Sequence, residues 1–411
     1  MSVALSGLNE DLQNEIYEAY FGKNGINYTL CRTHINSCDY CEKSYSYDDV
    51  ADDFNLTHFS IAHDEKTLIP MILKAYKTAE NAGRKRFKLF ASPWSPPAWM
   101  KFSDTMIGSL IPGLGLEEKY HRVWAEYLSR YMTEYKKRGV DMWAMTVQNE
   151  PLNLFINWEA CFYWAEEERD FVSKYLGPTM ERDHPELKII IFDHNKDNIV
   201  WYVSDILKHQ DAAKYISGSG FHWYAGAHFD HLDQVHEAFP DKFLLSTEAC
   251  AGPGVLLGAW DRGERYGRAI IGDLNHWSAG WVDWNMVLQV KNCTSTTKFC
   301  ISGPNHADPQ GDDSPIAADT VLQKVHYQIP YFYIGHFSKF IQPDSVRISV
   351  SMTVVGVNAT AFLTPKNDIV LVVMNTSDRP VEFDIAYKNQ KASVTSPQHA
   401  IQTFIWKQDC P

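Results

Sequence analysis

The chain has 411 residues, of which 45% are hydrophobic, and a formal net charge of -13 at pH 7. This length accommodates one large domain and a smaller one, and no apolar run approaches the roughly 20 residues that a membrane-spanning helix needs. The acidic charge argues against nucleic acid as a partner, because proteins that bind phosphate backbones carry basic patches.

Up to about residue 335, the sequence alternates between short β-rich runs and helical patterns. A helix is expected first, because an apolar residue recurs every four positions: Leu8, Leu12, Ile16 and Tyr20. Seven runs with strand character follow, at residues 26–35, 86–94, 142–151, 188–195, 215–224, 242–250 and 280–288. Helical patterns between these runs predict a parallel sheet with helical crossovers.

These elements predict an α/β fold, namely a (β/α)8 barrel, or TIM barrel, whose first strand is missing. An open doubly wound sheet is the alternative, but no G-x-G-x-x-G or P-loop motif follows the early strands. After residue 335, short alternating strands are separated by turn residues, which predicts an antiparallel β-sandwich. We therefore expect a barrel domain over residues 1–335 and an incomplete β-sandwich domain over residues 336–411.

Two of the predicted strands end in a glutamate. The run WAMTVQNEP stops at Asn149 and Glu150, where Pro151 turns the chain out of the strand, and the run KFLLSTEAC stops after Glu248. In a βα barrel the carboxyl ends of the strands meet at the mouth, where catalytic groups lie. Two carboxylates that face across a pocket are the minimum for glycoside hydrolysis. The alternative is that both glutamates cap neighbouring helices.

The eight cysteines are too few for a disulfide scaffold and show no paired zinc-ribbon spacing. Cys38 and Cys41 form a single C-x-x-C motif, which is weak support for redox or zinc chemistry. Five N-x-S/T sequons favour a secretory compartment and give the candidate glycosylation sites Asn27, Asn55, Asn292, Asn358 and Asn375. The N-terminus nevertheless lacks the basic and apolar regions of a signal peptide.

Nine segments, in their order along the chain, resemble the lysosomal glucosylceramidase (glucocerebrosidase) family, glycoside hydrolase family 30. They read CRTHINSCDY, LFASPWSPPAWMK, TVQNEP, FHWYAG, STEAC, GWVDWNMVL, SGPN, DSPI and YFYIGHFSKFI. The resemblance runs from about residue 3 to Trp406. It implies a retaining β-glucosidase that hydrolyses glucosylceramide to glucose and ceramide by double displacement, with no metal and no organic cofactor.

The resemblance also implies roles for individual residues. Glu150 matches the acid/base of the family, and Glu248 matches its nucleophile. The positions that match sugar-binding residues are Asp39, Trp94, Asn149, Tyr224, Trp284 and Asn305. Arg32 and His222 match groups that orient or charge-balance the carboxylates. Ordinary structural roles remain the alternative for Arg32, His222 and Asn305.

Two segments outside the strand ends carry further predictions. The apolar segment 101–118 is expected to border the pocket and to contact ceramide tails or a membrane surface through Met106, Ile107, Leu110, Ile111 and Leu114. Packing of this segment on its own domain is the alternative. The segment between Trp284 and Asn305 is an insertion relative to the family, and its Cys293 and Cys300 are candidates for a local disulfide.

Members of the family begin with strands of the β domain and the first barrel strand, so we expect this chain to be a truncated isoform or an incomplete one. By resemblance it belongs in the lysosome or the secretory pathway, peripheral to the membrane. Its expected partners are glucosylceramide, an anionic lipid surface and a saposin-like activator. Two alternatives remain: an inactive fragment that binds glycolipid or partners, and a related retaining glycosidase that acts on xylan or β-1,6-glucan.

Overall fold

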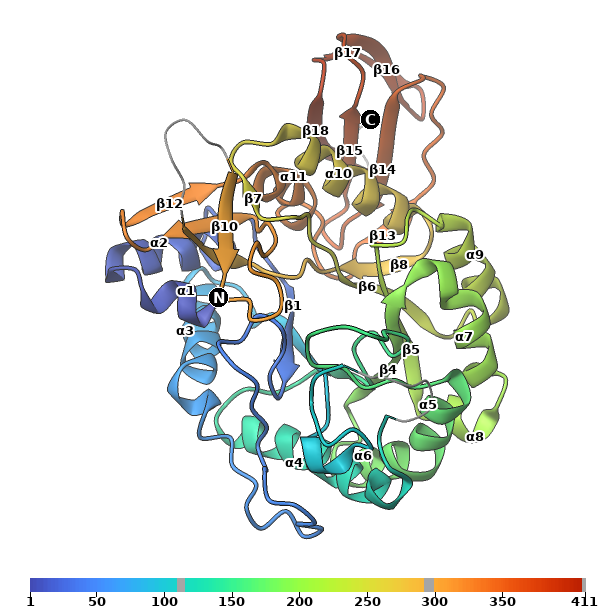
Figure 1. The fold of residues 1–411 in the computed structure, drawn as a ribbon. Coiled ribbons are helices and arrows are strands. Elements are labelled where there is room, and N and C mark those ends of the chain that lie inside the picture. Colours follow the sequence, from blue (N-terminus) through green and yellow to red (C-terminus); the bar gives the residue numbers. More distant parts are fainter. Residues whose placement is uncertain (109–114, 292–298, 409–411) are drawn as a thin grey trace.

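Seven parallel strands form a curled sheet in the computed structural model, which describes residues 1–108, 115–291 and 299–408 (Figure 1). They lie in the order β1 (Leu30–Ile35), β2 (Lys88–Pro93), β3 (Ala144–Thr146), β4 (Lys188–Asn195), β5 (Ile216–His222), β6 (Phe243–Glu248) and β8 (Ser278–Trp281). Each strand overlaps one of the seven predicted runs, and each neighbouring pair is parallel. The predicted TIM-like barrel is confirmed.

The two end strands of this sheet, β1 and β8, approach each other. A Cβ atom added to Gly280 on β8 would lie 3.2 Å from a methyl carbon of Leu30 on β1. Apolar side chains fill the inside of the barrel: Leu30, Phe90, Ala144, Ile190 and Leu245 come from five of the strands, and Val282 directly follows β8. The Leu30 side chain of β1 therefore packs close to the backbone of Gly280 on β8.

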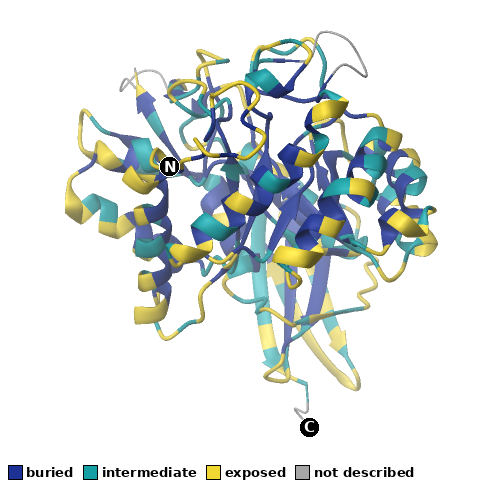
Figure 2. Ribbon diagram, turned by 90° about the horizontal axis from the view of Figure 1, so that it is seen from below, coloured by how far each residue is buried: buried dark blue, intermediate teal, exposed yellow. Residues whose placement is uncertain are grey.

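Helices cover the outside of the barrel, so that its strands are buried and the outward faces of the helices are exposed (Figure 2). Asn9 accepts a hydrogen bond from the backbone N–H of Leu12 and so caps α2. None of the described helices is long and apolar enough to cross a membrane. The larger helices are α2 (Glu10–Phe21), α3 (Leu68–Asn81), α4 (His121–Lys137), α5 (Ala165–Phe171), α6 (Gly177–Asp183), α7 (Ile199–Leu207), α9 (Phe229–Ala238), α10 (Trp260–Asn275) and α11 (Ile329–Ser338).

A second, mixed sheet, most of whose strands follow β8, was not predicted from the sequence. Its strands lie in the order β12 (Lys324–Tyr327), β11 (Ile316–Asp319), β9 (Val287–Lys291), β10 (Phe299–Gly303) and β7 (Val255–Leu256). Two of these five strands lie in the segment that differs from the family, and the other three are two to four residues long. Short strands give weak sequence signals, because too few residues show the alternation of a strand.

The C-terminal region consists of antiparallel strands, as predicted. One sheet has the order β13 (Val346–Ile348), β14 (Val357–Leu363), β15 (Asp368–Asn375) and β18 (Ala400–Lys407), and a hairpin joins β16 (Val381–Tyr387) and β17 (Gln390–Ser396). On β15, Leu371 and Val373 pack toward the hairpin side, whereas Val370, Val372 and Met374 pack with residues of α10 and α11. Burial on both faces explains the continuous apolar run of this strand.

The structure separates the candidate glycosylation sites. Asn55 and Asn358 are exposed and Asn27 is half-buried, whereas Asn292 lies outside the described residues. Asn375 is fully buried, and its amide donates to the carbonyl oxygens of Arg379, Ser396 and Pro397. The folded chain has no room for a glycan at Asn375, so this candidate is wrong.

Two other predictions fall on or beside residues that the structure does not describe. Leu110, Ile111 and Leu114 of the apolar segment lie outside the described residues, and within it Met106 is buried while Ile107 is half-buried. Cys293 also lies outside them, so its disulfide with Cys300 stays a prediction.

Candidate active site

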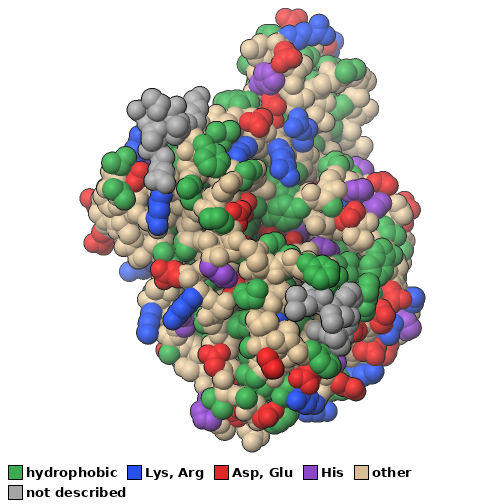
Figure 3. All heavy atoms as spheres, in the orientation of Figure 1, with side chains coloured by type: hydrophobic (Ala, Val, Ile, Leu, Met, Phe, Trp, Pro, Cys, Tyr) green, Lys and Arg blue, Asp and Glu red, His purple; other side chains and the backbone are tan. Residues whose placement is uncertain are grey.

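Polar side chains converge at the carboxyl ends of six barrel strands. Arg32 lies on β1, Ser92 on β2, Asp193 on β4, His222 on β5 and Glu248 on β6, whereas Asn149 and Glu150 lie just after β3. Figure 3 shows a hollow near the centre of this face, with hydrophobic, acidic and histidine side chains around it. The mouth of the barrel thus carries one connected polar cluster.

Arg32 is the centre of this cluster. Its guanidinium donates to Glu248 Oε2, to Asn149 Oδ1 at 2.8 Å and to Asp193 Oδ2 at 2.7 Å. Its Nε donates to Ser92 Oγ at 2.9 Å. The Arg32 side chain is only 2% exposed, and a buried carboxylate without a positive partner is costly. Arg32 therefore orients two carboxylates and balances part of their charge.

His222 bridges two carboxylates of the cluster. Its Nδ1 lies 3.2 Å from Glu150 Oε1 and its Nε2 lies 3.0 Å from Asp193 Oδ1. Burial opposes protonation, but the negative charges of Glu248, Asp193 and Glu150 prevail and raise the pKa of His222 to about 9. Despite burial, Arg32 and His222 hold the pKa of Asp193 well below its usual range.

The two glutamates are shifted in opposite directions. Burial favours the neutral form of Glu150, but the hydrogen bond and positive charge of His222 prevail and lower its pKa. Burial raises the pKa of Glu248, although His222 and Arg32 oppose this effect. Tyr224 donates its hydroxyl hydrogen to Glu248 Oε1 at 2.9 Å. Different surroundings thus separate two chemically identical groups.

Glu150 and Asp193 share an unusual backbone. Both are non-glycine residues in the left-handed region, with φ angles of 46° and 50°. The N–H of Glu150 donates to the carbonyl oxygen of Asp193 at 3.0 Å, which ties the two strand ends together. Such conformations cost about 1 to 3 kcal/mol each and persist where the surrounding structure holds them, which is common at functional sites.

Two tryptophans form an aromatic wall beside the cluster. The rings of Trp94 and Trp284 stack with centroids 4.9 Å apart, and the Arg32 guanidinium lies 4.7 Å from the Trp94 ring. Tyr40 packs edge-on against Trp284 and donates to Asp312 Oδ2 at 2.7 Å. Burial and then the nearby charge of Glu248 raise the pKa of Asp39 well above its usual value. This side of the mouth is aromatic and acidic.

Asn305, one of the predicted sugar-binding residues, uses its side-chain oxygen for hydrogen bonds within its own loop. Its Oδ1 accepts hydrogen bonds from the backbone N–H groups of Ala307 and Asp308. The following residue, His306, donates its backbone N–H to the carbonyl oxygen of Asp39 at 3.0 Å. The loop thus lies beside Asp39, and the sugar-binding role of the Asn305 side chain stays a prediction.

Sequence reasoning missed Asp193 and its neighbour His194. Asp193 binds both Arg32 and His222, and the imidazole of His194 lies 4.0 Å from Glu150 Oε1. The signal was present, because the fourth predicted strand ends in FDHN much as the third ends in QNEP. A consistent search for polar residues at strand ends would have included Asp193.

Glu150, His222 and Glu248 each offer a ligand atom, and these atoms lie within 4.8 Å of one another. The donor set does not fit a cation well, because Arg32 and the protonated His222 already place positive charge there. A second such group consists of His34, Cys38 and Cys41, away from the glutamates.

The barrel, the β-sandwich and the paired glutamates define a class of glycoside hydrolases. The glycosyl hydrolase family 30 TIM-barrel domain matches residues 1–341, and the beta sandwich domain of that family matches residues 344–404. The chain belongs to glycosyl hydrolase family 30, so the family inferred from the nine segments is confirmed.

Three individual proteins that this chain is similar to give more detail than the family match. The chain is 33% identical over 417 residues to the lysosomal acid glucosylceramidase of Mus musculus. The aligned region covers 97% of this chain and 78% of that protein. It is 25% identical over 403 residues to the endo-1,6-beta-D-glucanase neg1 of Aspergillus fumigatus, with 93% and 77% covered. The crystal structure of SrfJ from Salmonella typhimurium matches with a TM-score of 0.91 and 30% identity, covering 99% of this chain and 87% of that chain.

Proposed function

We propose that this protein is a retaining β-glucosidase that hydrolyses glucosylceramide to glucose and ceramide. The observation that carries the mechanism is the closeness of the two glutamates: a carboxylate oxygen of Glu150 lies within 4.8 Å of one of Glu248. Retaining glycosidases place their carboxyl groups about 5 to 5.5 Å apart, whereas inverting enzymes leave about 6.5 to 9.5 Å for a water molecule. The short distance between the two carboxylates therefore favours the retaining mechanism.

In the first step, Glu248 attacks the anomeric carbon of glucose while Glu150 protonates the oxygen that leaves with ceramide. The bonds from Arg32 and Tyr224 hold the two oxygens of Glu248 and so orient its carboxylate. A bond forms between Glu248 and the sugar as the bond to the ceramide oxygen breaks. In the second step, Glu150 removes a proton from water, which attacks the glycosyl-enzyme and releases glucose.

Glu150 and His222 share the proton that is used in the first step. His222 is protonated in the resting site, and its Nδ1 lies 3.2 Å from Glu150 Oε1, so a proton passes directly between them. The lowered pKa of Glu150 keeps its carboxylate ionised in the resting site, so the proton rests on His222 until the first step. When Glu248 becomes covalently bound, its negative charge is lost, which lowers the pKa of His222 and releases its proton more readily.

The substrate assignment rests on the relatives. The chain shares more identity with the mouse lysosomal acid glucosylceramidase, at 33%, than with the Aspergillus endo-1,6-beta-D-glucanase, at 25%. Glycosidase activity on a β-1,6-glucan is therefore the less favoured assignment. The same comparison supports a lysosomal or secretory route. A lipid surface as the site of action and a saposin-like activator stay predictions of the family resemblance.

The test compares the whole chain with Glu248→Gln and Glu150→Gln on a fluorogenic β-glucoside and on glucosylceramide in liposomes. We expect Glu248→Gln to lower kcat at least about 1000-fold, because the nucleophile is removed while the fold remains. Glu181→Gln is the matched control, since Glu181 is an exposed residue of α6. A 2-deoxy-2-fluoroglucoside should attach to Glu248, as shown by peptide mass spectrometry.

The stereochemistry and the substrate are tested separately. Proton NMR should show β-glucose as the first product, and an α-anomer would overturn the retaining mechanism. Xylan and β-1,6-glucan serve as competing substrates. Faster hydrolysis of either polymer than of glucosylceramide would overturn the substrate assignment but leave the glycosidase assignment in place.

A further inference from the structure

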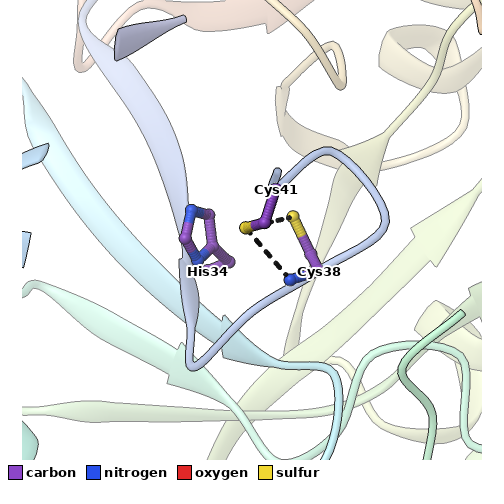
Figure 4. A group of neighbouring side chains, drawn as sticks. All are labelled: His34, Cys38 and Cys41. Atoms are coloured by element: carbon purple, nitrogen blue, oxygen red, sulfur yellow. Dashed lines mark hydrogen bonds between the residues drawn. The ribbon is translucent and has the colours of Figure 1, made fainter. Parts of the chain in front are cut away.

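Outside the glutamate cluster, three potential metal ligands come together at the end of β1. His34 lies on β1, and Cys38 and Cys41 lie on the turn that follows it, with their sulfur atoms directed toward each other (Figure 4). One ligand atom from each residue lies within 4.8 Å of the other two. The sequence motif involved only the two cysteines, so the histidine is a contribution of the fold.

We propose that His34, Cys38 and Cys41 form a binding site for Zn²⁺. The two sulfur atoms are 3.8 Å apart. Two thiolates bound to one tetrahedral zinc ion at about 2.3 Å have their sulfurs about 3.8 Å apart, which is the edge of the tetrahedron. A disulfide needs a sulfur–sulfur distance of about 2.0 Å, so the turn would have to change shape to form one.

The atoms around the three ligands also suit a metal. His34 donates its Nδ1 hydrogen to the carbonyl oxygen of Asn36 at 2.6 Å, which fixes the tautomer and leaves the Nε2 lone pair free. A hydrogen bond of this kind is typical of metal-binding histidines. The backbone N–H of Cys38 donates to the sulfur of Cys41 at 3.3 Å, which stabilises a thiolate there.

An ion has a path to this site and space for a further ligand. A cavity of about 510 Å³ is lined by His34, Cys38 and Cys41, among other residues. Cys38 is buried, whereas His34 and Cys41 are half-buried. Three protein ligands with an open side match zinc sites in which water takes the fourth position.

The turn that holds the two cysteines also connects this site to the barrel mouth. Asp39 and Tyr40 lie between them in the sequence, and Tyr40 contacts Trp284 and Asp312. Bound zinc would fix this turn. Its expected effect on the sugar site, a lower KM for the β-glucoside with little change in kcat, rests on the proposed function. The proposal that the site binds zinc does not depend on the proposed function.

The experiment uses the full chain, purified with a phosphine reductant and without substrate. Mass spectrometry of metals should find about one Zn²⁺ per chain, and Co²⁺ in its place should give the absorption of sulfur-to-metal charge transfer. Cys41→Ser and His34→Gln should bind Zn²⁺ at least about tenfold more weakly. Cys161→Ser is the control, because Cys161 is a buried free cysteine outside this group.

Three outcomes would overturn the proposal. The first is a chain that binds no Zn²⁺ while circular dichroism shows it to be folded. The second is equal loss of zinc in Cys161→Ser and Cys41→Ser. The third is obtained with chain purified without the reductant: a mass 2 Da lower with Cys38 and Cys41 protected from alkylation, since that identifies a disulfide. None of these outcomes bears on the glycosidase, whose test uses substrate turnover.

Discussion

The two sides of the barrel mouth differ in how their negative charge is balanced. On one side, which we call the paired side, Glu150, Asp193 and Glu248 contact Arg32 or His222. On the other, the unpaired side, Asp39 and Asp312 form no salt bridge with any residue in the described part of the chain. Burial is the largest cause of the raised pKa of both unpaired acids.

This difference shows what each side is suited to do. Carboxylates with cationic partners are held in a fixed orientation, as a nucleophile requires, and their cations oppose the effect of burial on the pKa. Acids without such partners gain most from a ligand that brings hydrogen-bond donors or positive charge. Sugar hydroxyl groups on Asp39 and a metal ion on the adjacent thiols would both supply what the unpaired side lacks.

Replacing Arg32 with methionine should break the paired side and have the largest effect. Asp193 and Glu248 would be left buried without this partner, so we expect the free energy of unfolding to fall by about 3 to 5 kcal/mol. The kcat on a β-glucoside should fall at least about 1000-fold. Urea unfolding and steady-state kinetics measure the two effects.

Arg169→Met is the matched control, because Arg169 pairs with Asp170 and Asp205 in a partly exposed position. We expect less than about 1 kcal/mol from that change. A stable Arg32→Met protein with activity within tenfold of the original would show that the paired side does not depend on this cation.

Asp193→Asn should remove one negative charge from the paired side and leave its other contacts in place. The change removes a negative charge next to His222, so the pKa of His222 should fall from about 9 toward its usual value. The alkaline limb of the pH–rate profile should therefore move to lower pH, and kcat should fall about 100-fold. Asp205→Asn is the control, and an unchanged alkaline limb in Asp193→Asn would contradict this role of His222.

Glu168 extends the comparison beyond the mouth, because it is a buried carboxylate whose described partners are neutral. It accepts hydrogen bonds from the Tyr202 hydroxyl and the backbone N–H of Phe192, and burial raises its pKa to about 7. The folded chain thus binds this proton more tightly than the unfolded chain does. Its contribution to stability is complete below about pH 4.5 and is lost as the pH rises through about 7.

We therefore expect Glu168 to make the protein about 2 kcal/mol more stable at pH 5 than at pH 7. Thermal unfolding at the two pH values measures the difference, and Glu168→Gln should reduce it by that amount. Glu166→Gln, at an exposed position of the same helix, is the control. An equal pH dependence in Glu168→Gln and the original chain would contradict the effect of burial.

Patterns along the chain were enough to predict the barrel. Periodicity located the seven strands, and the strand ends pointed to Glu150 and Glu248. The five-stranded mixed sheet was missed, because its short strands obtain their stability from partners distant in sequence, such as Val287 beside Ile316. Asn375 was misjudged for a related reason, since a sequon does not show whether its amide is buried.

The sequence by itself determined the family, the order of the strands and the two glutamates, because these depend on local residue patterns. Only the tertiary structure decided which charges balance one another. Arg32, Asp193 and His222 lie on three different strands, and their contacts arise from the curvature of the sheet. The position of His34 beside Cys38 and Cys41 likewise depends on how the turn after β1 folds back. The number of residues between two positions does not determine their distance in space.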